Sequence, residues 1–379
     1  MRKHLILVGG GHAHMVTLEN IGEFVDKGFK VTVIAPSYYH YYSGMGPGML
    51  GTSYTPDDIR FATRKVVTSQ GGIFVRDRVT RIDPDLKQVV TLSGNSFTYD
   101  VLSFNAGSYV PMDAAAGQGE RPGNIYPVKP IEKLMEASDR LTALFKEKKA
   151  VVSVVGGGPS AAEVAGNVWQ LAKKTKANYP LIRIIAGKGF MLRFVPRVRD
   201  RVKRILAGRG IEILEGVYAE KVGQERILTS SGESLSTDFT FMALGVTPSD
   251  IFEASGLPTG SDRGLLVNAY LQCPEYPEIF GGGDCICFHP RPLDKVGVYA
   301  VRENPVLFRN LMVSLEGKRD KLEMFQPGPD YLLIFNLGGG KGVLKKHNLI
   351  FGGRIAFWIK DYIDKRFIKR FQAIENGLR

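Results

Sequence analysis

Short apolar runs and longer segments with helical spacing alternate along most of this chain. A run of four to eight apolar residues is typical of a buried strand, whereas apolar residues three and four positions apart indicate one face of a helix. The order strand, helix, strand occurs twice, at 3–8, 14–27 and 29–34 and again at 150–155, 160–173 and 181–185. The chain therefore contains two predicted strand–helix–strand units, each of the size of a mononucleotide-binding half.

The segments between and after these units add shorter elements. Further helices are predicted at 131–149, 197–210 and 296–315, and short strands at 99–105, 212–214, 225–229, 239–244 and 331–335. Residues 38–54 and 117–130 are rich in Gly and Pro, which predicts a loop and a connector. The whole pattern predicts an α/β fold with two Rossmann-like dinucleotide-binding domains and a C-terminal β and amphipathic-helix region.

Both units carry a glycine-rich turn directly after their first strand. The three fingerprint positions hold Gly9, Gly11 and His14 in the first unit, and Gly156, Gly158 and Ala161 in the second. The first position makes a tight turn, the second lets the backbone approach a pyrophosphate, and the third allows close packing of helix on strand. His14 departs from this pattern and predicts looser packing there. A turn without a ligand is the alternative, and it is the weaker interpretation because the turn occurs twice.

Neither unit has an acidic residue at the end of its second strand, where such a side chain normally accepts hydrogen bonds from a ribose. The first unit has Ala35 and Pro36 at this place, and the second has Lys188 shortly after it. Lys188 and Arg193 are either ligands of a 2′-phosphate, which favours NADPH over NADH, or solvated surface residues.

Charge and cysteine content narrow the class of protein. The formal net charge is +12 over 379 residues, and the last 39 residues hold ten Lys or Arg against three Asp or Glu. This localisation indicates an anionic surface as a partner of that end. The first apolar run stops at Gly9, so it is too short for a signal peptide, and a cytoplasmic protein is expected. The three cysteines do not suggest a secreted disulfide framework or a zinc site.

Several segments together resemble the pyridine nucleotide–disulfide oxidoreductase superfamily. They are the two turns, the strand ends at 106–108 and 244–248, and the segment 279–284. Segments 42–48, 297–303 and 358–367 resemble more narrowly the type II NADH dehydrogenase-like flavoproteins, in particular the branch fused to selenophosphate synthetases. The resemblance implies an FAD domain at 1–115 and 265–330, an inserted NAD(P)H domain at 116–264, and a C-terminal region at 331–379.

The resemblance also implies the residues of both sites. The FAD residues are Gly9, Gly11, His12, Ala35, Pro36, Gly46, Pro47, Val79, Ala106, Gly107, Asp284, Cys285 and Val298. The NAD(P)H residues are Gly156, Gly158, Ala161, Glu163, Lys188 and Gly245, with Glu163 near the nicotinamide. Asp284 is expected to accept from the ribityl chain, and Gly46 and Pro47 to lie near the isoalloxazine. The chemistry is expected to be centred on the flavin, with no protein catalytic residue and no metal.

Two departures from the family bear on the electron acceptor. Residues 1–272 contain no cysteine, which excludes the early redox pair of disulfide reductases and predicts a buried structural role for Cys285 rather than a redox role. Type II dehydrogenases carry paired glutamines after the FAD aspartate, and this chain has Arg302 and Glu303 there. This departure predicts either an acceptor other than a quinone or a different mode of quinone binding.

The basic tail contains a stripe of large apolar residues at helical spacing. The stripe is Ile355, Trp358, Ile359, Tyr362, Ile363 and Phe367, with Lys and Arg, including Lys360, between its members. Such a helix either lies in a membrane interface or packs on its own FAD domain or on a second subunit. Nucleic-acid binding is not favoured, because no recognition motif accompanies the charge. His12 and His14 are interpreted as packing residues rather than metal ligands.

The combined prediction is an FAD-dependent oxidoreductase that passes electrons from NAD(P)H through the flavin to a quinone or similar acceptor. A peripheral position on the inner face of the cell membrane is expected, and a homodimer is an open alternative. Two other functions stay open. One is a flavin-dependent oxidoreductase for sulfide or selenium species with a vestigial NAD(P) domain. The other is a non-catalytic, redox-sensing flavoprotein.

Overall fold

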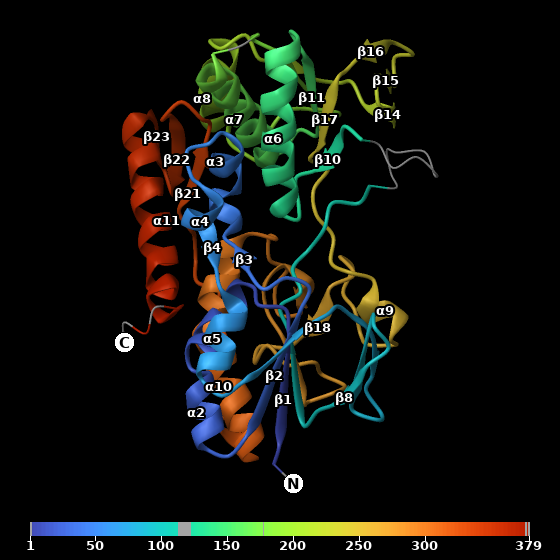
Figure 1. Ribbon diagram of the computed structural model, residues 1–379, viewed down its shortest axis with the longest axis vertical. Helices are drawn as coiled ribbons and strands as arrows, with labels where there is room; N and C mark the ends of the chain where they lie inside the picture. The colour runs from blue at the N-terminus through green and yellow to red at the C-terminus, as the bar shows by residue number, and fades with distance from the viewer. Residues whose placement is uncertain (1, 113–122, 177, 376, 378–379) are drawn as a thin grey trace.

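The computed structural model describes residues 2–112, 123–176, 178–375 and 377, and its two large sheets lie at opposite ends of the molecule (Figure 1). Both sheets are parallel, and each contains the two strands of one glycine-rich strand–helix–strand unit. The C-terminal helix runs along one side of the molecule (Figure 1). The predicted division between residues 115 and 116 lies outside the described residues.

The first sheet combines strands from both ends of the chain. Its order is β19-β9-β1-β2-β5, and the strands are β1 His4–Val8, β2 Lys30–Ala35, β5 Ile73–Arg76, β9 Val101–Phe104 and β19 Ile279–Gly281. The order reverses between β1 and β9, because the chain runs first to one side of β1 and then to the other. In sheets of this kind a ligand binds at the carboxyl ends of the strands, at the reversal point.

Four strands of the second sheet repeat the order of β9-β1-β2-β5, but its fifth strand comes first in the sequence rather than last. Its order is β10-β17-β11-β12-β13, and the strands are β10 Ile125–Pro127, β11 Val151–Val155, β12 Leu181–Ile185, β13 Glu212–Leu214 and β17 Phe239–Met242. Every pair in the sheet is parallel. Strands of a parallel sheet are covered on both faces, which explains why these strands read as continuous apolar runs rather than alternating ones.

Helices cover both sheets and carry the connections. The α-helices are α1 Met15–Glu19, α2 Ile21–Asp26, α3 Gly46–Leu50, α4 Pro56–Ile59, α5 Thr63–Ser69, α6 Glu132–Glu147, α7 Pro159–Thr175, α8 Pro196–Ala207, α9 Ile251–Ala254, α10 Gly297–Glu316 and α11 Arg354–Glu375. Short 3-10 turns are η1 His12–His14, η2 Ser43–Met45, η3 Gly283–Cys285 and η4 Arg319–Lys321. Helix α10 packs on β9, β19 and η1, and α7 packs on β11 and β12.

Smaller sheets complete the two halves and the C-terminal region. They are β3 His40–Tyr41 with β4 Arg60–Phe61; β6 Val79–Asp83, β7 Gln88–Thr91 and β8 Ser96–Thr98; β14 Ala219–Val222, β15 Arg226–Thr229 and β16 Ser234–Ser236; β18 Leu265–Val267 with β20 Ile286–Phe288; and β21 Leu333–Asn336, β22 Gly342–Lys346 and β23 Leu349–Gly353. The last of these sheets packs against α11 and, through β21, against α7.

The structure differs from the sequence prediction at two places in the first half. The predicted helix at 14–27 is divided at Asn20 into α1 and α2, and the side-chain amide of Asn20 donates to the carbonyl oxygen of Val16. The predicted loop at 38–54 contains α3, which begins at Gly46 and has Pro47 in its first turn. Proline suits the first turn of a helix, where an N–H would have no intrahelical partner.

Candidate flavin and pyridine-nucleotide sites

The first glycine-rich turn is held against the end of β9 by Asn105. A Cβ at Gly9, whose φ is +87°, would lie 2.3 Å from the carbonyl oxygen of Asn105, and a Cβ at Gly11 would lie 2.2 Å from its side-chain oxygen. That oxygen accepts from the backbone N–H of Ala13 at 3.0 Å, and the amide nitrogen donates to the carbonyl oxygen of Gly282 at 2.6 Å. Asn105 therefore joins the carboxyl ends of β1, β9 and β19 and requires glycine at both predicted positions.

His14 fills the position at which the sequence predicts looser packing, and that prediction is wrong. The imidazole is fully buried and lies 2.7 Å from the carbonyl oxygen of Gly9 and 2.8 Å from the hydroxyl of Ser103. A neutral ring satisfies both neighbours when Nδ1–H donates to Gly9 and Nε2 accepts from Ser103. Burial lowers the pKa of His14 to about 4, so the ring stays neutral near pH 7.

Asp284 lies in η3, directly after β19, and is bound by residues from both halves. The hydroxyl of Ser108 donates to its carboxylate at 2.8 Å, and the ammonium of Lys129 donates to the same oxygen at 2.6 Å. Lys129 follows β10 of the second sheet and also lies 3.2 Å from Ser108. The sequence motifs indicate Asp284 but not Lys129, which falls in the segment predicted to be a connector.

A buried carboxyl group supports the turn that carries Asp284. The backbone N–H of Gly283 donates to Glu303 of α10 at 2.5 Å. Burial raises the pKa of Glu303 to about 7, and the nearby Asp284 carboxylate adds to the rise. Arg302 turns the other way and donates to the carbonyl oxygens of Pro327 and Asp330. Arg302 and Glu303 therefore both hold backbone segments in this chain.

Four rings gather beside the first turn. His12 lies 4.8 Å from the His40 ring, 5.1 Å from Tyr42 and 6.0 Å from Phe367 of α11, measured between ring centroids. The Nε2 atoms of His12 and His40 are buried and make no hydrogen bond with the described part of the chain. Burial lowers the pKa of both rings, to about 4 for His40, and the charge of Lys129 contributes to each shift. Two neutral polar groups therefore remain to be satisfied by a bound ligand.

The end of β2, which lacks the ribose acid, is followed by a basic and aromatic cluster. The guanidinium carbons of Arg64 and Arg76 each lie 4.9 Å from the centroid of the Tyr38 ring. Arg76 pairs with Ala35 across β2 and β5, so the cluster lies at the carboxyl edge of the first sheet. The sequence motif does not indicate these residues, because it expects an acidic side chain at the end of β2.

The remaining predicted FAD residues are distributed around the same edge. Ala35 ends β2 and Pro36 follows it; Val79 begins β6; Ala106 and Gly107 follow β9; Val298 lies in the first turn of α10; and Cys285 lies in η3. Cys285 is fully buried, as its predicted structural role requires, and burial raises its pKa to about 11. Gly46 and Pro47 lie in α3, which packs on α6 and α7, so they are placed where the two halves meet.

The second glycine-rich turn has the same steric requirement as the first. Gly156 has a φ of +136°, and a Cβ there would lie 2.1 Å from the carbonyl oxygen of Ala243. Gly158 is the N-cap of α7 and has open space around it, while Ala161 is fully buried against the sheet. Gly245, with a φ of +91°, follows β17. The turn and Gly245 thus lie at the carboxyl ends of adjacent strands, the edge at which open parallel sheets bind their ligands.

Glu163 is partly buried on α7, and its carboxyl group faces the C-terminal region. Its carboxylate accepts from the backbone N–H of Asn336 in β21 at 2.7 Å. Burial raises its pKa to about 7, and the charge of Lys360 on α11 partly opposes that rise. Lys360 forms a buried ion pair with Asp364 at 2.8 Å, and Tyr42 donates to the other oxygen of that carboxylate at 3.2 Å. Lys360 is therefore not part of the surface charge that the sequence assigns to this helix.

Lys188 and Arg193, the candidate ligands of a 2′-phosphate, lie in the segment after β12. Lys188 is exposed, and Arg193 is paired with Asp294 at 3.5 Å. The choice between NADH and NADPH stays a prediction.

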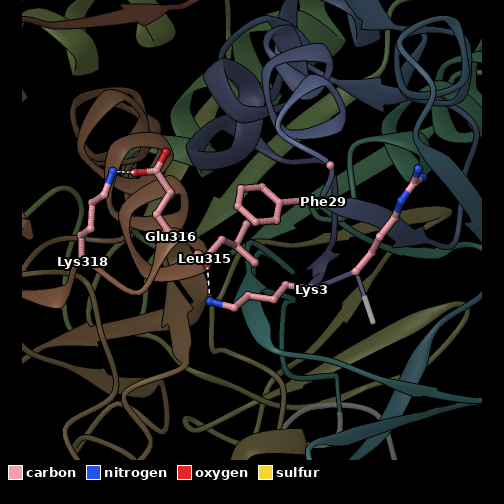
Figure 2. Close-up of a pocket in the computed structure, with 7 residues that line it drawn as sticks. Lys3, Phe29, Leu315, Glu316 and Lys318 are labelled. Atoms are coloured by element: carbon pink, nitrogen blue, oxygen red, sulfur yellow. Dashed lines mark hydrogen bonds and ion pairs between the residues drawn. The ribbon is translucent and has the colours of Figure 1, made fainter.

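One further feature, a surface hollow, lies apart from these sites. This hollow, lined by Lys3, Phe29, Leu315, Glu316 and Lys318, lies beside the amino ends of β1 and β2, opposite the glycine-rich turn (Figure 2). Among the described residues, no group of three His, Cys, Asp or Glu side chains is placed to hold a metal ion. Within the same residues, no helix is long and apolar enough to cross a membrane.

This architecture agrees with the comparisons to known proteins. Residues 3–305 match the family model described as pyridine nucleotide-disulphide oxidoreductase, and the chain belongs to that family. It is 24% identical to a type II NADH:quinone oxidoreductase of Staphylococcus saprophyticus, covering 98% of this chain and 97% of the relative. It is 27% identical to ferroptosis suppressor protein 1 of Taeniopygia guttata over 72% of this chain and 71% of that protein.

Solved structures show the same fold along nearly the whole chain. The structure of NDH2 from Plasmodium falciparum with NADH has a TM-score of 0.83 at 17% identity, covering 99% of this chain and 98% of that one. The sulfide:quinone oxidoreductase of Aquifex aeolicus has a TM-score of 0.78 at 19% identity, covering 99% and 92%. The predicted α/β fold class and family are confirmed.

The chain is an FAD-dependent oxidoreductase that uses a pyridine nucleotide. The residues present fit the flavin. Gly9 and Gly11 leave room for nothing larger than hydrogen beside Asn105. The buried Nε2 atoms of His12 and His40 make no hydrogen bond with the described residues, so a bound ligand can bond to them. Asp284 offers a carboxylate at the carboxyl edge of the sheet, as hydroxyl groups of a ribityl chain require.

Proposed function

We propose that this chain oxidises NAD(P)H and passes the electrons through FAD to a quinone at a membrane surface. The observation that carries the proposal is the pair of parallel sheets that share the order of four strands, β9-β1-β2-β5 and β17-β11-β12-β13, each with a glycine that admits no side chain at its turn. One sheet bears Asp284 and the neutral histidines, and the other bears Gly245 and Glu163. The names of the relatives support NADH as the donor and a quinone as the acceptor.

The residues of the chain bind, orient and handle protons in this scheme. FAD, when bound, accepts a hydride from the nicotinamide and delivers electrons to the acceptor. The first turn and Asp284 hold FAD, and the second turn with Gly158, Ala161 and Gly245 holds the nucleotide. Glu163 holds a proton near neutral pH, because its pKa is raised to about 7 by burial.

The proposed membrane contact is one face of α11. Ile355, Trp358 and Tyr362 are 63%, 64% and 64% exposed, while Ala356, Ile368 and Phe371 on the other side are buried. The helix therefore packs on its own chain and still presents large apolar side chains outward. Aromatic and aliphatic residues next to Lys and Arg are typical of helices that lie in a membrane interface. A second subunit on this face is the competing occupant.

The test is anaerobic reduction of the purified flavoprotein. NADH or NADPH is expected to bleach the flavin absorbance at a rate that a stopped-flow experiment resolves, and a short-chain ubiquinone or menadione is expected to restore it. The faster nucleotide identifies the donor. If neither nucleotide bleaches the flavin and sulfide does, the second domain is vestigial and the alternative function holds. Negligible turnover with all acceptors, together with redox-dependent vesicle binding, would favour the redox-sensing alternative.

A further inference from the structure

Lys129 joins the two halves of the molecule at the carboxyl ends of the strands of the first sheet, where the flavin is proposed to bind. It follows β10 at the edge of the second sheet, whereas its partners Asp284 and Ser108 follow β19 and β9 of the first sheet. The side chain of Lys129 is 24% exposed and that of Asp284 is 12% exposed. An ion pair shielded in this way keeps more of its strength than one on the open surface.

Within the described part of the chain, no other titratable group near this pair is a full charge partner of either member. Glu303, on the far side of Asp284, has a pKa raised to about 7, so it carries only part of a negative charge near neutral pH. Lys295 is engaged by Asp262 at 2.7 Å. His12 and His40 stay neutral, because burial and the charge of Lys129 both lower their pKa values. Lys129 and Asp284 thus balance each other, and the rings of His12 and His40 near Lys129 are neutral.

We propose that Lys129 positions Asp284 for the flavin and compensates the negative charge that the flavin gains when it is reduced. Hydride transfer converts the nicotinamide donor to its oxidised form and adds two electrons and one proton to the flavin, which gains one negative charge. A lysine ammonium beside the cleft stabilises that charge. The proposal rests on the proposed function, since it concerns the flavin that accepts the hydride.

Removal of the Lys129 ammonium has two effects, and both are expected to disfavour the reduced flavin. The reduced flavin loses a favourable charge, and the Asp284 carboxylate then faces the cleft without its partner. Both effects disfavour the reduced state relative to the oxidised state, and the charge near a flavin is one of the means by which a protein tunes its electronics. By contrast, a residue that only joins the two halves would alter the affinity for oxidised and reduced flavin equally.

The experiment compares three variants of the flavin-loaded protein. Lys129→Gln keeps a hydrogen-bond donor but removes the charge, and Lys129→Arg keeps the charge. Lys148→Gln is the control, because Lys148 also pairs with an aspartate, Asp238, but at the amino ends of β11 and β17, far from the carboxyl ends where Lys129 lies. The midpoint potential of each is measured by anaerobic equilibration with a reference dye, and the affinity for FAD is measured by fluorescence.

The Gln variant is expected to favour reduced flavin about tenfold less than the parent, which is a potential lower by roughly 30 mV for a two-electron couple. The Arg and Lys148→Gln variants are expected to keep the parent potential. An unchanged potential in Lys129→Gln, with or without weaker FAD binding, would overturn the proposal. If that variant does not retain FAD, Lys129→Met serves as a second uncharged variant under the same criterion. Failure of the parent protein to bleach with NAD(P)H would instead overturn the proposed function.

Discussion

At the scale of single residues, burial gives Glu163 properties that its sequence context does not show. The carboxyl group lies inside the junction of α7, β21 and α11, and its pKa is raised from 4.5 to about 7. The folded protein therefore holds this proton at pH values where the unfolded chain has released it. Because the folded state binds more protons, its stability falls as the pH rises from about 4.5 to 7.

Glu163→Gln is expected to remove part of this pH dependence. The amide oxygen can still accept from Asn336, and the variant no longer has a proton to lose. The destabilisation that the parent develops between pH 4.5 and 7 is at most about 3 kcal/mol for this group. Urea unfolding at several pH values measures it, with the exposed Glu220→Gln as control. The same slope in parent and variant would contradict the assignment; a residual slope is expected because Glu303 has a similar shift.

The residues that the sequence predicts and those it misses differ in how far their partners lie along the chain. The turn glycines and the burial of Cys285 follow from local motifs, and the structure agrees with them. Asn105, Lys129 and His40 gain their roles from partners far away, as when Lys129 meets Asp284 155 residues later. Such contacts arise only when strand ends are brought together, and one sequence does not show which ends meet. The functional roles of the predicted site residues stay predictions.

At the scale of elements, the periodic pattern of α11 predicts the helix but not the side on which it packs. The spacing of its apolar residues predicts a helix at 355–371, and the structure has one at Arg354–Glu375. The pattern does not show which side faces the protein. Asp364 and Lys360 lie on the packed side, where they satisfy each other, while Trp358 and Tyr362 lie outward. Polar residues can line a packed face when they are paired, which a hydrophobicity pattern does not reveal.

The exposed side of α11 is expected to bind anionic vesicles. Ile355→Ser combined with Trp358→Ser should weaken co-sedimentation with vesicles of phosphatidylglycerol and phosphatidylcholine by about tenfold or more, because two large side chains no longer enter the interface. The unfolding midpoint should change little, since both positions are more than 60% exposed.

A matched control for that experiment uses other exposed apolar residues. Tyr179 and Met324 are 52% and 53% exposed and lie outside α11. Tyr179→Ser combined with Met324→Ser is expected to leave vesicle binding unchanged. If the parent protein does not bind vesicles and is a dimer, and the α11 variant is a monomer, a second subunit covers this face.

At the scale of the whole molecule, the C-terminal region connects the two halves. Arg209, after α8, donates to the carbonyl oxygens of Leu337 and Gly338, and its guanidinium carbon lies 4.3 Å from the ring centroid of Trp169. At the other end, Arg370 of α11 pairs with Glu19 of the first half at 3.1 Å. The region beyond β21 is thus attached to both sheets and fixes how they face each other.

Arg209→Met is expected to lower the free energy of unfolding by roughly 2–4 kcal/mol. Two buried carbonyl groups lose a charged donor, and Trp169 loses its cation. Urea denaturation followed by tryptophan fluorescence and by flavin release measures the change, and the exposed Arg226→Met is the control. A loss under 0.5 kcal/mol would show that the attachment contributes little.

The position of β19 in the first sheet has a consequence for synthesis. The second sheet is continuous in the chain and can be completed on the ribosome, whereas the first sheet receives its fifth strand, and then Asp284, only about 280 residues from the start. Domains generally fold as units during synthesis, and contacts between distant segments form late. The flavin half therefore matures after the half inserted into it. A product that terminates before η3 lacks Asp284 and, under the proposed function, is expected to retain less FAD than the full chain.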